Sequence, residues 1–160
     1  MFRGRWTEEI HAEWMSNLLK NRPELLPERI QKTREHIDTA VPDCLVTGYE
    51  DLIPELALPD QGDRHVLAAA IRCQADVIVT YNRRDFPPAV LERYSIEAQH
   101  PDTFLRYQAE LSQPQFLACA RSVRQRLKKP PITAPEYIID LAARELVQTA
   151  SWLGDYAALI

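Results

Sequence analysis

The sequence predicts an α/β fold in which a parallel sheet is flanked by helices and is followed by an α-helical C-terminal extension. Two observations lead to this prediction. The segment LPDQGDRHVLAAAIRCQADVIVTYNRRDFP, residues 58–87, has an apolar helix pattern that leads directly into a short apolar strand pattern. From Gln113 to the end of the chain, the apolar spacing is that of helices alone.

Two helices are predicted near the N-terminus. Thr7 is a suitable N-cap, and the apolar residues behind it recur every four positions, which predicts a helix over about 8–20. Pro23 ends this helix, and a second, more polar helix is expected over about 27–38. We expect the second helix to pack along one edge of the domain.

The middle of the chain supplies the sheet. CLVTGY, residues 44–49, is apolar and β-rich at its start, and Gly48 is a breaker near its end. Asp63 occupies the N-cap of the helix that contains VLAAAIRCQ, and residues 76–80 are expected to form a strand buried on both faces. The further predicted elements are a short helix at 87–94, a strand at 96–99 and a helix at 101–111.

The C-terminal part is predicted to contain helices only. Thr133 and Glu136 have the spacing of a capping box for a helix that starts at Tyr137, and Thr149 is expected to cap a last helix. The chain is therefore predicted to consist of an α/β domain, residues 1–111, and a helical extension, residues 112–160.

Composition limits the classes of protein that this chain can belong to. Its 160 residues, 46% of them hydrophobic, are enough for a folded core. No apolar run approaches the roughly 18 residues of a membrane span, and the opening MFRGRWTEEI lacks a signal peptide's apolar core, so we expect a cytoplasmic protein with no membrane partner. The net charge of −4 means that a nucleic acid would have to be held by a local basic patch or a bound metal.

Carboxylates stand at both ends of the central helix-strand unit. Asp63 starts the helix and Asp85 follows the strand, so both are expected at the sheet edge where ligands bind in open α/β folds. Glu13, in the first helix, is a further candidate for the same crevice. Such an all-oxygen set suits Mg²⁺ or Mn²⁺, and without metal the mutual repulsion should raise at least one pKa. Taken singly, each acid, including Asp60 and Asp76, is more often a cap, a turn residue or a surface charge than a metal ligand.

The combined pattern DRHVLAAAIRCQADVIVTYNRRDFP resembles the second half of PIN-domain nucleases, in which D-x-x-x-x-A-x-A starts a helix and an apolar strand is followed by T-x-N/D-x-x-D-F. WTEEIHAEW near the N-terminus and the helical extension are similar to bacterial toxins of the VapC type. The resemblance spans about residues 6–104. It implies a PIN-like, Mg²⁺- or Mn²⁺-dependent endoribonuclease of a toxin-antitoxin system, which acts on single-stranded or structured RNA and binds a cognate antitoxin protein.

The resemblance also assigns roles to individual residues. Thr80 would orient a ligand or water through its hydroxyl, Asn82 stands where many members have aspartate, and Asp60 would help from outside the ligand set. Catalysis and metal binding would fall to Glu13, Asp63 and Asp85.

One departure from the family pattern concerns the start of the chain. Members normally begin with an apolar central strand that ends in an aspartate, often D-x-N, whereas this sequence opens with MFRGRWTEE. We therefore expect the N-terminal central strand and its carboxylate to be missing, through truncation, a misassigned start or supply of the strand by a second polypeptide. The expected nuclease activity of the sequence as it stands is weak or absent.

Basic residues suggest where RNA would bind. Arg83 and Arg84 adjoin the predicted crevice and are the stronger candidates. Arg121 and Arg124 share one face of the helix that contains ARSVRQRLKK, but a solvated helix face is the commoner explanation for such a pair. His65 is expected at the surface or just behind the site. Two other functions stay open: a catalytically dead PIN-like module that binds RNA or a protein through the same crevice, and a homodimerisation domain that uses the helical extension.

Overall fold

The computed structural model describes residues 2–128 and 130–160, so Lys129 of the segment ARSVRQRLKK lies outside the described residues. The chain divides into two compact units. Residues 3–78 and 82–98 form the first, here called the α/β unit, and Phe2, residues 79–81 and residues 99–160 form the second, here called the helical unit. Within residues 2–128 and 130–160, no helix is long and apolar enough to cross a membrane.

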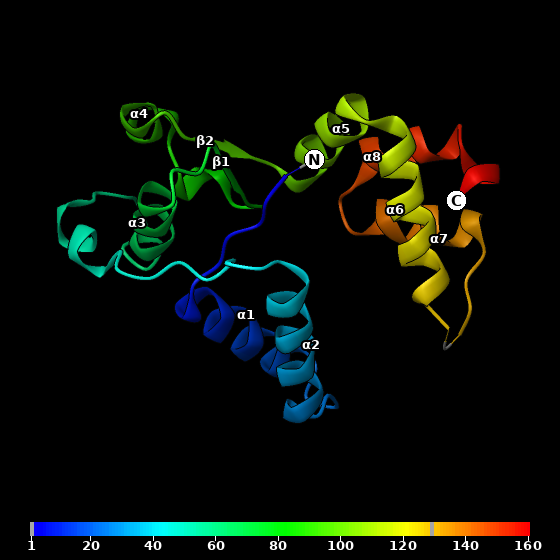
Figure 1. The fold of residues 1–160 in the computed structure, drawn as a ribbon, viewed down its shortest axis with the longest axis horizontal. Helices are drawn as coiled ribbons and strands as arrows, with labels where there is room; N and C mark the ends of the chain where they lie inside the picture. Colours follow the sequence, from blue (N-terminus) through cyan, green and yellow to red (C-terminus); the bar gives the residue numbers. More distant parts are fainter. Residues whose placement is uncertain (1, 129) are drawn as a thin grey trace. The chain divides into compact units, whose positions relative to one another are not determined.

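The α/β unit begins with two neighbouring helices, α1 (Glu8–Asn21) and α2 (Pro27–Ala40) (Figure 1). The predicted cap of α1 is confirmed, since the Thr7 hydroxyl accepts a hydrogen bond from the backbone N–H of Ile10 at 3.0 Å. His11, to which the sequence gave no role, is fully buried between the helices. Its Nε2 lies 3.0 Å from Oδ1 of Asp38 on α2, and its Nδ1 accepts a 2.9 Å hydrogen bond from the indole N–H of Trp14.

The β-rich segment at 44–49 forms no strand. It makes an isolated parallel bridge between Trp6 and Leu45, in which the Trp6 N–H donates to the Cys44 carbonyl and the Val46 N–H donates to the Trp6 carbonyl, both at 2.8 Å. A short 3-10 helix, η1 (Glu50–Glu55), follows. The expectation of a β-rich element at this place is therefore wrong beyond a single bridge.

The small sheet consists of two parallel strands, β1 (Val77–Val79) and β2 (Glu97–Gln99). The N–H of Glu97 donates to the Asp76 carbonyl and the N–H of Thr80 to the Gln99 carbonyl, both at 2.9 Å. The predicted burial of β1 on both faces is wrong, because Val79 is 44% exposed.

Helix α3 (Arg64–Arg72) supplies much of the core of the α/β unit. Leu67 and Ala68 are fully buried, and α3 packs against η1. After β1, the chain forms the 3-10 helix η2 (Arg83–Asp85), α4 (Pro88–Leu91) and η3 (Glu92–Tyr94), which agrees with the predicted short helix. The buried core residues are Val46, Tyr49, Leu56, Leu67, Ala68, Ala69, Ala70, Ile78, Phe86, Leu91 and Ile96.

The helical unit contains α5 (Pro101–Leu111), α6 (Gln113–Arg126), α7 (Ala134–Ala143), α8 (Val147–Gly154) and the 3-10 helix η4 (Ala157–Leu159). Helix α5 packs against α6 and α8, and α7 packs against α8. The predicted boundary between residues 111 and 112 falls inside this unit and stays a prediction. The fold as a whole is the predicted one, a small parallel sheet with flanking helices followed by C-terminal helices.

The two predicted caps of the helical unit have different outcomes. Thr133 and Glu136 form the predicted capping box at the start of α7. Thr149 is not a cap; it lies buried inside α8. The start of α8 is instead held by Asp102 of α5, whose carboxylate accepts hydrogen bonds from the N–H groups of Gln148 and Thr149, both at 2.8 Å.

Candidate metal centre

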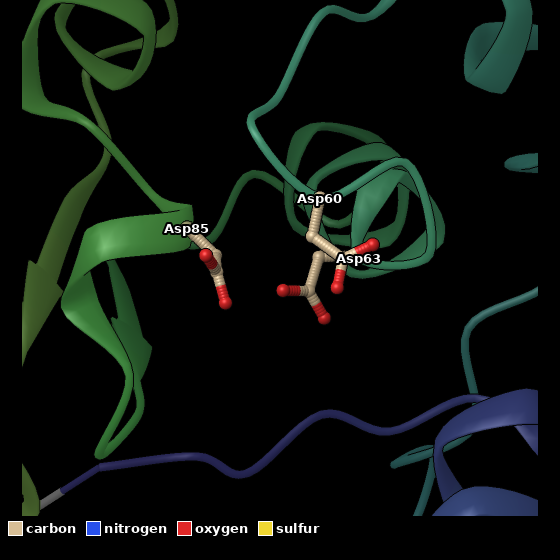
Figure 2. A group of neighbouring side chains, drawn as sticks. All are labelled: Asp60, Asp63 and Asp85. Atoms are coloured by element: carbon tan, nitrogen blue, oxygen red, sulfur yellow. The ribbon is translucent and has the colours of Figure 1, made fainter.

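Three aspartates of the α/β unit meet at one place. One carboxylate oxygen each from Asp60, Asp63 and Asp85 lies within 4.8 Å of the others. Figure 2 shows Asp60 and Asp63 side by side at the start of α3, with the carboxylate of Asp85 facing them from η2. We call these three residues the aspartate cluster.

A turn and a helix start position the first two members. Oδ1 of Asp60 accepts a 2.7 Å hydrogen bond from the N–H of Gly62, which closes a tight turn immediately before α3. Asp63 is the N-cap residue of α3, as predicted, but its side chain makes no capping hydrogen bond. Its carboxylate points into the cluster, and the position beside the positive end of the helix dipole favours a negative charge there.

Asp85 is fixed by the residues on either side of it. The side-chain amide of Asn82 donates a hydrogen bond to Oδ2 of Asp85, and the N–H of Asp85 bonds to the Asn82 carbonyl at 3.4 Å. Phe86, which follows, is buried in the core of the α/β unit. Asn82 therefore orients a cluster member through a direct hydrogen bond.

The electrostatics of the cluster favour a bound cation. Partial burial of the carboxyl group raises the pKa of Asp63 above its usual value, and the neighbouring charges of Asp60, Asp85 and Glu13 raise it further. The donor atoms are all carboxylate oxygens, the ligands that Mg²⁺ and Mn²⁺ prefer. Repulsion among these acids is relieved when a divalent cation lies between them, so the residues present fit such an ion.

Glu13 lies outside the group of acids that come within mutual reach among the described residues. Oε1 of Glu13 lies 3.2 Å from Nε2 of His65, and its charge contributes to the raised pKa of Asp63. The structure thus places Glu13 near enough to act electrostatically on the cluster.

The remaining predicted site residues are distributed as follows. Thr80 follows β1 and donates its backbone N–H to the Gln99 carbonyl. Arg83 and Arg84 are exposed on η2, directly before Asp85. On α6 of the helical unit, Arg121 is exposed, whereas Nη1 of Arg124 donates a 2.9 Å hydrogen bond to the Ile132 carbonyl. The guanidinium of Arg124 thus has a structural partner within its own unit. The assigned roles of these residues stay predictions.

Sequence reasoning gave two residues less weight than the structure does. Asp60 was expected to help from outside the ligand set, and the structure brings it as close as the other two aspartates. His65 was expected at the surface or just behind the site, and it is 3% exposed. The spacing Asp60-x-Gly62-Asp63 is the signal for the first, because a glycine turn between two acids brings them together.

Two families of known proteins match parts of this chain. Residues 1–84 match the family described as PIN domain, and residues 101–155 match the family described as VapC50 C-terminal domain. A protein of Mycobacterium tuberculosis named "Putative ribonuclease VapC50" is 38% identical over 117 residues, which cover 71% of this chain and 68% of that protein. No solved structure matches the chain significantly.

Proposed function

Since this chain belongs to the PIN-domain family of VapC-type ribonucleases, we propose that it is a divalent-metal-dependent endoribonuclease that acts as the toxin of a toxin-antitoxin pair. The observation that carries the proposal is the convergence of Asp60, Asp63 and Asp85 within 4.8 Å. These acids come from two separate elements. Bringing their negative charges together is unfavourable unless a cation offsets the repulsion.

Asp60, Asp63 and Asp85 are the residues that would hold the ion, with Glu13 as a further ligand. PIN nucleases generally use divalent metal ions, and Mg²⁺ or Mn²⁺ suits an all-carboxylate donor set. When bound, such an ion supplies activation of water and stabilisation of charge at a phosphodiester. Asn82 contributes by fixing the carboxylate of Asp85 through the hydrogen bond that its side-chain amide donates to Oδ2.

The substrate class follows from the charges beside the cluster. Arg83 and Arg84 are exposed and adjoin Asp85, where they would contact the phosphates of an RNA strand and hold it against the acids. VapC-like proteins generally have an RNA substrate and an antitoxin partner, so a cognate antitoxin and a place of action in the cytoplasm belong to the same proposal.

An RNA cleavage assay tests the proposal. The expectation of weak or absent activity rested on the opening of the sequence alone; because Asp60, Asp63 and Asp85 come together, we now expect the protein to cleave single-stranded RNA in Mg²⁺ or Mn²⁺. EDTA should stop the reaction. Asp85→Asn should reduce the rate by about 100-fold or more, since one removed ligand charge weakens both metal binding and charge stabilisation. Asp76→Asn is the matched control: Asp76 belongs to the same helix-strand unit, is exposed and lies outside the aspartate cluster. Its activity should equal that of the wild type.

Two other outcomes have definite meanings. RNA binding without cleavage in either metal would contradict the enzyme and favour the catalytically dead PIN-like module. Equal cleavage by the wild type and by Asp85→Asn would show that the aspartate cluster is not the site of the reaction.

A further inference from the structure

A buried histidine lies between the aspartate cluster and helix α1. His65, in the first turn of α3, is 3% exposed. Its Nε2 lies 3.2 Å from Oε1 of Glu13, and its Nδ1 lies 3.6 Å from Oε2 of Glu9; both glutamates belong to α1. The ring thus faces two carboxylates that are one helical turn apart.

The contact between His65 and Glu13 determines which ring nitrogen of His65 carries a hydrogen. A carboxylate only accepts hydrogen bonds, so Nε2 of His65 carries the hydrogen that Glu13 accepts. Nδ1 is a buried atom with no hydrogen-bond partner among the described residues. A buried polar atom without a hydrogen-bond partner lowers the stability of the fold, so packing alone does not account for a histidine at this place. The next buried positions of α3, Leu67 and Ala68, are apolar.

The hydrogen bond acts on a side chain that would otherwise be mobile. The side chain of Glu13 is 51% exposed and has three rotatable bonds. Its charge already acts on Asp63, because it helps to raise the pKa of that carboxyl group. With Oε1 bonded to His65, the second oxygen of Glu13 remains for another partner. Fixing the side chain in advance lowers the entropy that a ligand has to lose when it binds.

We propose that His65 is a positioning residue that holds the carboxylate of Glu13 ready for a divalent cation at the aspartate cluster. His65 contacts Glu13 and acts on the cation through it, as residues behind metal ligands commonly do. The inference rests on the proposed function of the cluster, and it adds one residue and one hydrogen bond to that site.

Calorimetric titration with Mn²⁺ alone tests the inference without an activity assay. We expect His65→Ala to weaken Mn²⁺ binding by about 10- to 100-fold, the usual effect of removing a residue behind a ligand. Glu13→Ala should weaken it at least as much. In the double variant, the loss should equal that of Glu13→Ala, because His65 acts through Glu13. His36→Ala, at an exposed histidine of α2 in the same unit, is the control for non-specific Mn²⁺-imidazole contacts.

Two conservative variants separate positioning from packing. The amide nitrogen of glutamine takes the place of Nε2, whereas that of asparagine takes the place of Nδ1. We therefore expect His65→Gln to restore Mn²⁺ affinity to near the wild-type value and His65→Asn to leave it weakened. Thermal unfolding of both variants in EDTA shows whether the fold is kept. This pair decides the question if His65→Ala does not fold.

The outcomes distinguish this inference from the function on which it rests. If Asp63→Asn abolishes Mn²⁺ binding and the His65 variants leave it unchanged, positioning by His65 is wrong and the metal site stands. Equal affinities of folded His65→Gln and His65→Asn would also overturn it, as would additive losses in the double variant. If the wild-type protein does not bind Mn²⁺, the proposed function and the positioning role fall together.

Discussion

Replacing Asp63 with asparagine is expected to stabilise the metal-free protein and to abolish its binding of Mn²⁺. Burial and the charges of Asp60, Asp85 and Glu13 raise the pKa of the Asp63 carboxyl group, which means that its charged form is disfavoured in the folded state. Asparagine has nearly the same shape and no charge, so it removes this repulsion. It also removes a proposed ligand, and the cation then has too few charged oxygens to hold it.

Thermal unfolding in EDTA and in Mn²⁺ measures both effects at once. In EDTA, Asp63→Asn should unfold at a higher temperature than the wild type. With Mn²⁺ at about 100 times its dissociation constant, the wild type should gain about 2.7 kcal/mol and the variant nothing. Asp76→Asn, at an exposed acid outside the cluster, should behave as the wild type in both conditions. A variant that is less stable than the wild type in EDTA would contradict the repulsion.

The difference in stability between Asp63→Asn and the wild type in EDTA should depend on pH, because the pKa of Asp63 is raised in the folded state. Asp63 has a folded pKa above the unfolded value of 3.8, so the folded state binds more protons between these two values. The stability of the wild type therefore falls as the pH rises through that range. The advantage of Asp63→Asn in EDTA should be full at neutral pH and should disappear as the pH falls below the unfolded value.

The second large effect concerns Asp102 in the helical unit. Asp102→Ala should lower the free energy of unfolding by about 3 kcal/mol, because two hydrogen bonds to a charged, buried acceptor are lost at the start of α8. Burial alone would raise the pKa of Asp102, but the hydrogen bonds from Thr149 and Gln148 outweigh it and hold the pKa below the usual value. The carboxylate is therefore charged in the folded state.

Urea unfolding followed by circular dichroism measures this loss, and Asp140→Ala is the control. Asp140 pairs with Arg144, the C-cap residue of α7, at 2.9 Å, and both side chains are largely exposed, so removal of Asp140 should cost less than about 1 kcal/mol. Because the folded pKa of Asp102 is lowered, its contribution is full above the unfolded value of 3.8 and is lost as the pH falls through the folded value. A difference between Asp102→Ala and the wild type that stays constant down to about pH 3 would contradict this assignment.

The elements that the sequence predicted well have strong local signals. The helix at 101–111 starts with Pro-Asp and appears with the predicted bounds, and the capping box of Thr133 and Glu136 forms as expected. The segment at 44–49 differs, because a strand needs a partner. Its hydrogen bonds go to Trp6, almost 40 residues away in the chain, and they end after one bridge. Apolar and β-branched composition alone does not supply that partner.

The candidate site could likewise be predicted only where local sequence signals determine it. That Asp63 and Asp85 would come together followed from the position of each at a helix start or after a strand. The burial of His65 and the contact of Asp102 with the start of α8 depend on which distant helix packs against each residue. No local pattern contains that information, which is why Thr149 was predicted to cap its own helix while Asp102, more than 40 residues earlier, does so.

The partly buried hydrogen bond between Trp14 and His11 gives this protein an intrinsic optical reporter. The indole N–H of Trp14 donates to a histidine that is also bonded to Asp38 on the neighbouring helix. If α1 and α2 separate, His11 loses Asp38, and His11 and the indole bonded to it become more exposed to water, so the fluorescence emission of Trp14 shifts to longer wavelength. With Trp6 and Trp152 replaced by phenylalanine, the emission wavelength of Trp14 would report in real time whether α1 and α2 stay packed together.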